Sequence, residues 1–167
     1  MSEHKAFRVS VTKDYLVFAA AHFITFAGHR CESLHGHNYR VAVVLEGDID
    51  EESWYVVDFS YLKQLMKRLC DEIDHKVLLP LENPKVQVSI EDDRVLVAYD
   101  NRPRYVFPRD DCALLAIPNT TVEMLAKYFV HQARIALTGK QFSKLADIEI
   151  EVEENFGQSA FYREQLG

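Results

Sequence analysis

The stretch "NYRVAVVLEGDI", residues 38–49, alternates apolar and polar side chains. This period of two residues predicts a half-buried β-strand, and the letters "EGD" begin the turn that ends it. We take this strand as the reference around which the neighbouring elements are arranged. The side chains of its apolar face are Tyr39, Val41, Val43 and Leu45.

The segment before it, "FRVSVTKDYLVFAAAHF" at residues 7–23, shows the same period. Apolar residues alternate up to Val11 and again at Tyr15 and Val17, which predicts one long strand or a hairpin. In either case the strand ends at His22. The first residues of the strand predicted at 38–49 would then lie beside that histidine.

Two amphipathic helices follow. After Asp58, a residue suited to N-capping, apolar residues are spaced three and four apart as far as Ile73. The second helix begins in "NTTVEMLAKYFVHQARIAL", where Thr120 and Glu123 fit the capping box S/T-x-x-E and Gly139 follows near the end. The predicted core face of the second helix is Val122, Leu125, Ala126, Phe129 and Ala133.

Residues 85–117 separate the two helices and contain the β-rich pieces "VQVSI" and "RVLVAY", joined by "EDD". We interpret them as an inserted hairpin or arm. The chain closes with "ADIEIEVEENFGQSAFYR", two strands around a turn at 155–158. Hairpins at both ends with helices between them predict an α+β fold with an antiparallel sheet, in a single domain over residues 1–167.

Composition and charge exclude several classes of protein. The chain has 167 residues and a net charge of -7, which disfavours a nucleic-acid partner because phosphate binding needs a basic surface. No apolar run approaches the ~20 residues of a membrane span, and "MSEHKAFRVSV" lacks an apolar signal core. Three cysteines, an odd number, argue for reduced thiols. We therefore expect a cytoplasmic protein with no membrane or nucleic-acid partner.

The stretch "GHRCESLHGHNYRV", residues 28–41, concentrates groups that bind metals. His35 and His37 are two apart in a strand and so point the same way, and His22 is the best third ligand. Three neutral imidazoles without a fourth protein ligand describe a catalytic zinc site. Two alternatives stay open here: loop histidines without metal, or Cys31 as a fourth ligand that closes the site. We favour Cys31 as a nucleophile or base.

Six motifs follow one another along the chain: "FAAAHF", "CESLHGHNY", "VVDFSYLK", "IDHKVLL", "NTTVEMLAKYF" and "VEENFGQSAFY". The chain resembles the 6-pyruvoyltetrahydropterin synthase and 6-carboxytetrahydropterin synthase family over nearly its whole length, apart from residues 85–117. The resemblance implies the tunnelling fold, a four-stranded antiparallel sheet with two helices between its second and third strands. It also implies a homo-oligomer built from trimers, up to a hexamer, and a zinc lyase that acts on 7,8-dihydroneopterin triphosphate.

The resemblance implies roles for individual residues. Cys31 matches the catalytic cysteine, and Asp74 and His75 match an Asp-His pair that moves protons. A histidine polarised by a carboxylate can do so near neutral pH, although Asp74 could instead only cap a helix end. The implied zinc ligands are His22, His35 and His37.

Two glutamates match positions near the pterin. Glu154 matches the anchor of the ring, because a carboxylate can accept two parallel hydrogen bonds from the 2-amino group and the neighbouring ring N–H. Glu123 falls on another such position, with the capping box as its alternative role. Candidate cations for the triphosphate are Arg30, Lys76 and Arg163.

The product is left open by two motifs. The spacing C-x3-HGH resembles the 6-carboxy enzyme of queuosine biosynthesis, whereas the 6-pyruvoyl enzymes of tetrahydrobiopterin synthesis have a longer spacing. Glu32, in C-E-x-x-HGH, resembles a variant that cleaves dihydroneopterin to 6-hydroxymethyldihydropterin for folate synthesis. We predict the 6-carboxy or 6-pyruvoyl lyase, with this aldolase-type enzyme and a non-catalytic pterin-binding protein as alternatives.

Overall fold

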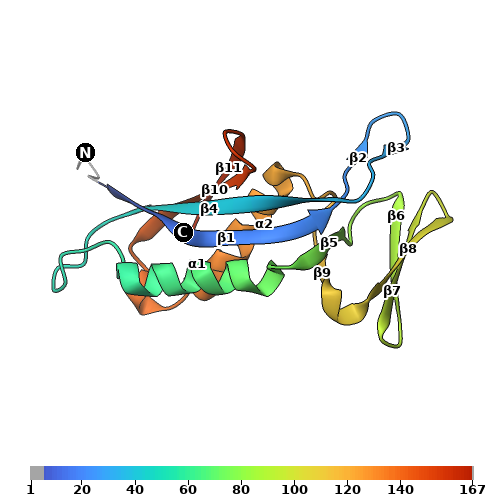
Figure 1. Cartoon of the computed structure of the whole chain (residues 1–167). Helices are drawn as coiled ribbons and strands as arrows, with labels where there is room; N and C mark the ends of the chain where they lie inside the picture. The colour runs from blue at the N-terminus through green and yellow to red at the C-terminus, as the bar shows by residue number, and fades with distance from the viewer. Residues whose placement is uncertain (1–5, 167) are drawn as a thin grey trace.

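The computed structural model describes residues 6–166, so the first five residues of the predicted domain and Gly167 lie outside the described part. Six strands form one mixed sheet in the order β11-β10-β4-β1-β5-β9 (Figure 1). The antiparallel strands are β1 (Phe7–His22), β4 (His35–Gly47), β10 (Leu145–Glu154) and β11 (Ser159–Gln165). The parallel additions are β5 (Lys76–Pro80) and β9 (Cys112–Leu115).

The four antiparallel strands are those that the sequence predicts, but a total of four strands for the sheet is wrong. Two residues separate the end of the first helix from β5, which pairs in parallel with Ala20 and Ala21 of β1. The pairing satisfies backbone groups at an edge of β1 that would otherwise stay open. A short apolar run such as "KVLLP" does not distinguish a strand from a helix end by its periodicity, so the sequence conceals it.

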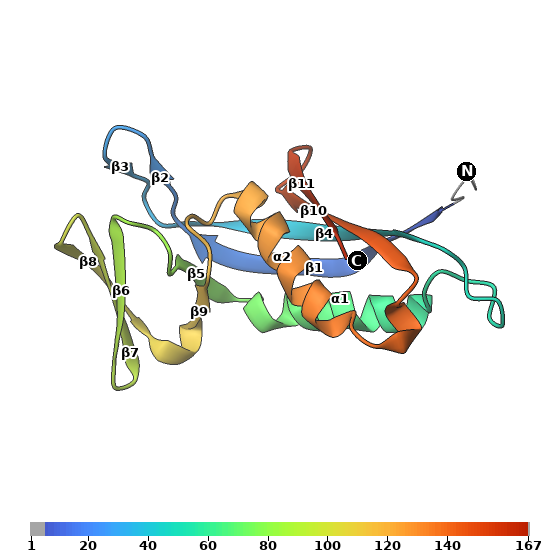
Figure 2. The same cartoon turned by 180° about the vertical axis from the view of Figure 1, so that it is seen from behind.

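The two helices lie between β4 and β10 in the chain, as predicted, and cover one face of the sheet (Figures 1 and 2). They are α1 (Phe59–Ile73) and α2 (Val122–Ala136). Asp58 caps α1 by accepting a hydrogen bond from the Ser60 N–H, as predicted. Neither helix of the described residues is long and apolar enough to cross a membrane.

The predicted capping box of α2 is wrong. The N-cap is Thr121, whose hydroxyl accepts from the Met124 N–H, while Glu123 is exposed in the first turn. The Thr120 side chain is buried and donates to the Phe23 carbonyl, 2.9 Å away. A long-range contact with the end of β1 therefore displaces the cap by one residue.

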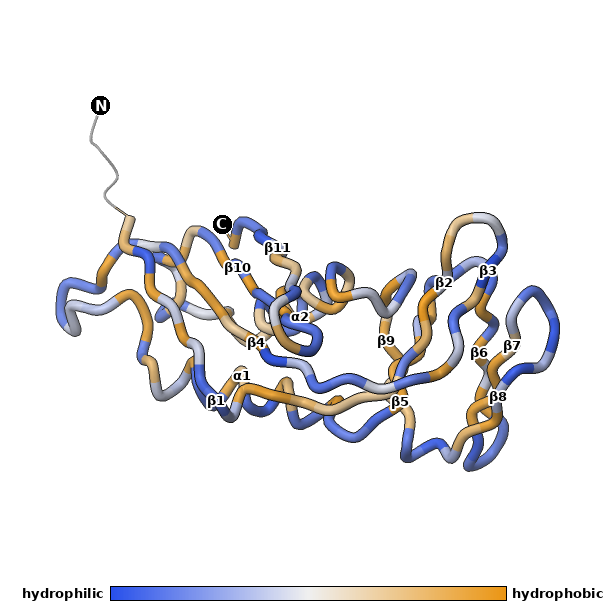
Figure 3. The backbone as a smooth tube through the Cα atoms, turned by 45° about the horizontal axis from the view of Figure 1, so that its top comes forward, coloured by the Kyte–Doolittle hydropathy of each residue, from blue (hydrophilic) through white to orange (hydrophobic). Residues whose placement is uncertain are grey.

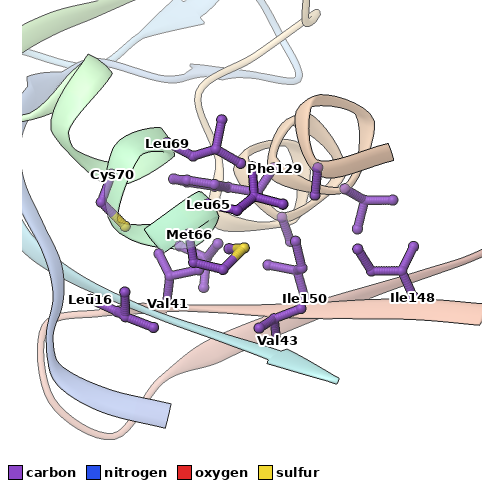
Figure 4. Packing of buried hydrophobic residues seen from close by; sticks show 14 of the residues in the cluster. Leu16, Val41, Val43, Leu65, Met66, Leu69, Cys70, Phe129, Ile148 and Ile150 are labelled. Atoms are coloured by element: carbon purple, nitrogen blue, oxygen red, sulfur yellow. The ribbon is translucent and has the colours of Figure 1, made fainter. Parts of the chain in front are cut away.

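The core lies between the helices and the sheet, where Figure 4 shows Met66 of α1 and Phe129 of α2 above Val43 and Ile150. All four side chains are fully buried. Burial of each such side chain contributes about 1.5–3 kcal/mol relative to its exposure. The buried layer therefore defines which face of the sheet points toward the helices.

β1 changes faces along its length. Val11 pairs with Val43 and points toward the helices, but the register shifts between Thr12 and Val17. After this bulge Leu16 is fully buried, whereas Tyr15 and Val17 are 42% and 40% exposed. The predicted apolar face of residues 15–17 is therefore wrong, because unpaired residues in the bulge reverse the alternation.

The insertion is a three-stranded antiparallel sheet, not a simple hairpin. The third strand contains Pro103 and Pro108, which argue against a strand in a sequence but are tolerated at a sheet edge. Two short strands form a separate hairpin after β1, and two 3-10 turns complete the chain. These elements are β6 (Val86–Glu91), β7 (Arg94–Tyr99), β8 (Arg102–Pro108), β2 (Thr25–Phe26), β3 (Arg30–Cys31), η1 (Arg109–Asp111) and η2 (Lys140–Phe142).

Candidate metal centre and active site

Three histidines converge where β1 ends and β4 begins. His22 is paired in register with His35, and His37 follows two residues later on the same side of β4. One nitrogen from each ring lies within 4.8 Å of the others, and the Nε2 atoms of His35 and His37 are 2.8 Å apart. The structure thus brings together the three residues predicted as metal ligands.

Backbone carbonyls orient two of the rings. Nδ1 of His22 is 2.9 Å from the Thr120 carbonyl, and Nδ1 of His35 is 2.9 Å from the Ser33 carbonyl. Because a carbonyl only accepts, each Nδ1 carries the proton and each Nε2 presents its lone pair to the cluster. Such outer hydrogen bonds fix the tautomer of metal-binding histidines.

The third ring is held by Asn155, whose amide nitrogen lies 2.9 Å from Nδ1 of His37. A half-turn of the amide presents its oxygen instead, which leaves Nε2 of His37 free for a metal as in the other two rings. Asn155 adopts a φ of 56°, in the left-handed region that Asn tolerates better than most residues. Sequence reasoning missed this contact, although an Asn in the turn after β10 was a visible signal.

The charge state of the cluster suits a cation. His22 is 2% exposed, and burial lowers its pKa to about 4, so its ring is neutral near pH 7. Metal binding requires neutral imidazoles. Three nitrogen ligands suit zinc and leave one coordination position open, which distinguishes catalytic from structural zinc sites.

Glu154 ends β10 opposite Tyr39 of β4 and points into the same cluster. Its carboxylate oxygens lie 3.4 Å from Nε2 of His37 and 4.0 Å from Nε2 of His22. The buried Tyr39 hydroxyl has no hydrogen-bond partner among the described residues, and burial raises its pKa, as do the Glu154 and Glu32 charges. The predicted pterin anchor therefore adjoins the candidate metal centre of its own chain.

Cys31 is the last residue of β3, and Glu32 follows it in the segment that leads to β4. The Glu32 carboxylate accepts from the Ile24 N–H at 3.2 Å and lies 3.7 Å from Nδ1 of His35. Cys31 is half-buried in a second apolar cluster that includes Phe23. Burial raises the pKa of its thiol, Arg104 acts to lower it and Glu32 acts to raise it. Only Glu32 of the two therefore contacts the three-histidine cluster directly.

Asp74 and His75 are in contact just after α1, with 2.8 Å between Asp74 Oδ2 and His75 Nδ1. Burial raises the pKa of Asp74, but hydrogen bonds from the Ala19 N–H and His75 outweigh burial, so the pKa lies below its usual value. His75 is exposed and lines a pocket of about 590 Å³ together with Ala19, Ala21 and the candidate metal ligand His37. Among the described residues no hydrogen bond or ion pair joins this pair to Cys31.

The predicted cations are dispersed. Arg163 lies on β11, far from Glu154 of β10. Ion pairs with Glu46 and Asp147 already neutralise its charge. Lys76 donates to the Asp110 carbonyl and lines the same pocket as His75. The Arg30 guanidinium lies 5.3 Å from the centre of the Phe26 ring.

The fold and the site define an α+β protein with a three-histidine centre able to hold one metal ion with an open position. Comparison with known proteins identifies the family. The model of "6-pyruvoyl tetrahydropterin synthase" matches residues 10–165. The chain belongs to this family, whose activity is that of a pterin synthase-type lyase, and the resemblance read from the motifs is confirmed at that level.

Individual relatives are similar over nearly the whole chain. A protein of Methanocaldococcus jannaschii named "Putative 6-carboxy-5,6,7,8-tetrahydropterin synthase" is 38% identical over 151 residues, 90% of this chain and 91% of that protein. The solved Plasmodium vivax 6-pyruvoyltetrahydropterin synthase has a TM-score of 0.88 at 28% identity and covers 96% of this chain and 99% of its own. A variant of that protein in which a catalytic glutamate is replaced by alanine matches with the same TM-score.

Proposed function

We propose that this protein is a zinc-dependent lyase that converts 7,8-dihydroneopterin triphosphate to 6-carboxy-5,6,7,8-tetrahydropterin, with loss of triphosphate and acetaldehyde. The observation that carries the proposal is the convergence of three Nε2 atoms beside the Glu154 carboxylate. The spacing C-x3-HGH and the 38% identical relative named for the 6-carboxy product support this product over the 6-pyruvoyl one.

The residues present fit zinc. His22, His35 and His37 would hold the ion through Nε2, since two Nδ1 atoms are engaged by carbonyls and the third by Asn155. When bound, zinc supplies Lewis acidity that lowers the pKa of the substrate's side-chain hydroxyls. Glu154 would orient the pterin by accepting two parallel N–H bonds. Cys31 as thiolate and His75, oriented by Asp74, would transfer the protons.

The first test is product analysis with 7,8-dihydroneopterin triphosphate and the zinc-loaded protein. We expect triphosphate and acetaldehyde in equal amounts. Triphosphate without a two-carbon fragment would indicate the 6-pyruvoyl product instead. No turnover with tight pterin binding would indicate the non-catalytic alternative.

A second candidate is the aldolase-type cleavage of dihydroneopterin to 6-hydroxymethyldihydropterin. Two observations favour it. Glu32 lies against His35, 3.7 Å from its Nδ1, and the Plasmodium vivax relative has a catalytic glutamate. The released fragment would then be glycolaldehyde, which separates this candidate from the first.

Replacement of Glu154 by glutamine should weaken pterin binding while zinc stays bound. The amide puts a donor where the carboxylate accepts, so one N–H of the pterin faces an N–H of the protein, at a cost of about 1–3 kcal/mol. Binding can be measured by calorimetry with a non-reacting pterin, and metal by elemental analysis. Glu153→Gln, the change one residue earlier on β10, is the control. Loss of zinc from Glu154→Gln would reassign Glu154 as a metal ligand.

The proton-transfer groups motivate an oligomer with shared sites. Cys31 packs in the second apolar cluster, whereas His75 lines the pocket that also includes His37 and Asn155, so we propose that a second subunit brings a Cys31 to each such pocket. β10 is not an edge strand, since β11 and β4 flank it and α2 covers Ile150. In the described residues, the outer strands of the six-stranded sheet are β11 and β9, and edges are normally paired or covered.

Mixing two inactive variants tests the shared site. Cys31→Ala and His75→Ala should each be inactive, but heteromers formed by co-refolding equal amounts should regain about one quarter of wild-type activity, as random pairing across a subunit interface gives. Light scattering should show an oligomer of trimers. A fully active monomer, or no recovery in heteromers whose mixed composition is confirmed, would contradict the shared site.

A further inference from the structure

The insertion, residues 85–117, and the Cys31–Leu34 segment lie side by side at one end of the molecule (Figure 3). Nη2 of Arg104, on β8, donates to the Glu32 carbonyl at 3.0 Å. The neighbouring Tyr105 hydroxyl accepts from the Leu34 N–H at 3.2 Å, and its ring packs on Phe23 with 5.5 Å between centroids. Two consecutive residues of the insertion thus bind the backbone on either side of Ser33.

The rest of this short segment is also tied down. The Glu32 N–H donates to the Ile24 carbonyl at 2.9 Å, and the Ser33 carbonyl accepts from His35. The arm therefore holds the same run of backbone that orients a candidate zinc ligand. A side chain on this run has a fixed position relative to the metal centre only while these contacts persist.

Arg104 is also the cation that acts on Cys31 among the described residues, and its Nη2 and the Cys31 Sγ both contact the Glu32 carbonyl, at 3.0 and 3.6 Å. The titratable groups that face the thiol are Glu32 on its own segment, Arg104 on β8 and Tyr99 on β7. Burial and Glu32 disfavour the thiolate, and Tyr99 is neutral near pH 7, since a tyrosine ordinarily loses its proton only near pH ~10 and burial raises the pKa of Tyr99 further. The positive charge that stabilises the Cys31 thiolate is therefore that of Arg104, a residue of the insertion.

We propose that Arg104, with Tyr105, is a positioning residue of the active site, which holds the Cys31–Leu34 segment and stabilises the Cys31 thiolate. The insertion is then a working part of the site, not only an appendage of the fold. The inference rests on the proposed role of Cys31 in proton transfer. It assigns Arg104 and Tyr105 of the insertion a function that the histidine motif alone does not suggest.

The test is alkylation of Cys31 by iodoacetamide, a neutral reagent that reacts with the thiolate. The rate is followed on the Cys31 peptide by mass spectrometry, from neutral to alkaline pH, in zinc-loaded protein. Arg104→Gln should react about two- to fivefold more slowly at neutral pH, the range of an exposed charge pair, and converge with wild type at alkaline pH. Arg104→Lys, which keeps the charge, should recover part of the rate.

Arg102→Gln, an exposed arginine two residues earlier on β8, is the matched control and should react like wild type. Equal rates for Arg104→Gln and wild type would overturn the proposal, as would an equal loss in Arg102→Gln or a loss that is the same at every pH. Alkylation needs no substrate, so this result stands even if product analysis refutes the proposed lyase reaction.

Discussion

Replacing His35 or His37 with alanine should remove the bound metal and the activity together. Each ring contributes an Nε2 to the cluster, where the two atoms are 2.8 Å apart, so removal of either ring leaves only two of the three nitrogen ligands. Loss of an outer hydrogen-bond partner of a metal ligand costs about 10–100-fold, and we expect loss of a ligand to exceed ~100-fold in turnover. Zinc content by elemental analysis should fall from one per chain toward zero in the same samples.

His131→Ala is the control for this prediction. His131 lies on the exposed side of α2 and pairs with Glu164 at 3.4 Å, away from the cluster. That variant should retain full zinc and turnover. A His35→Ala or His37→Ala protein with stoichiometric zinc would show that the ligand assignment is wrong.

The second large effect concerns Cys31. In Cys31→Ala we expect triphosphate elimination to fall by about 10²–10⁴-fold, the usual contribution of a general acid or base, with zinc and pterin still bound. Glu32→Ala should leave elimination largely intact, because its carboxylate faces the Nδ1 side of His35 and not the converging Nε2 atoms. Triphosphate release and zinc content are measured on both proteins.

Ser33→Ala serves as the matched control, since the carbonyl of Ser33 and not its side chain contacts His35. Zinc loss from Cys31→Ala would make Cys31 a ligand. The aldolase candidate predicts the reverse pattern: glycolaldehyde released from dihydroneopterin, abolished by Glu32→Ala and spared by Cys31→Ala. That pattern would replace the proposed lyase with the second candidate.

Local sequence was sufficient for elements whose determinants lie within a few residues of each other. α1 begins after Asp58 and ends at Ile73 as predicted, because its cap and its apolar spacing are contained in one segment. The pair His35 and His37 shares a face for the same reason, since side chains two apart in a strand point the same way. The order of the four antiparallel strands and the two helices could likewise be read from period and turn residues.

Long-range contacts set the rest of the site. His22 faces His35 only because the bulge after Thr12 reverses the alternation of β1, and a bulge is a property of two paired strands. The Thr120 hydroxyl donates to the Phe23 carbonyl and does not cap α2 as predicted. The Thr120 carbonyl contacts the His22 ring, which is 98 residues away in the chain. These contacts form only when the sheet, α2 and the insertion pack together. Buried polar groups need hydrogen-bond partners, and the tertiary structure determines which groups lie close enough to serve.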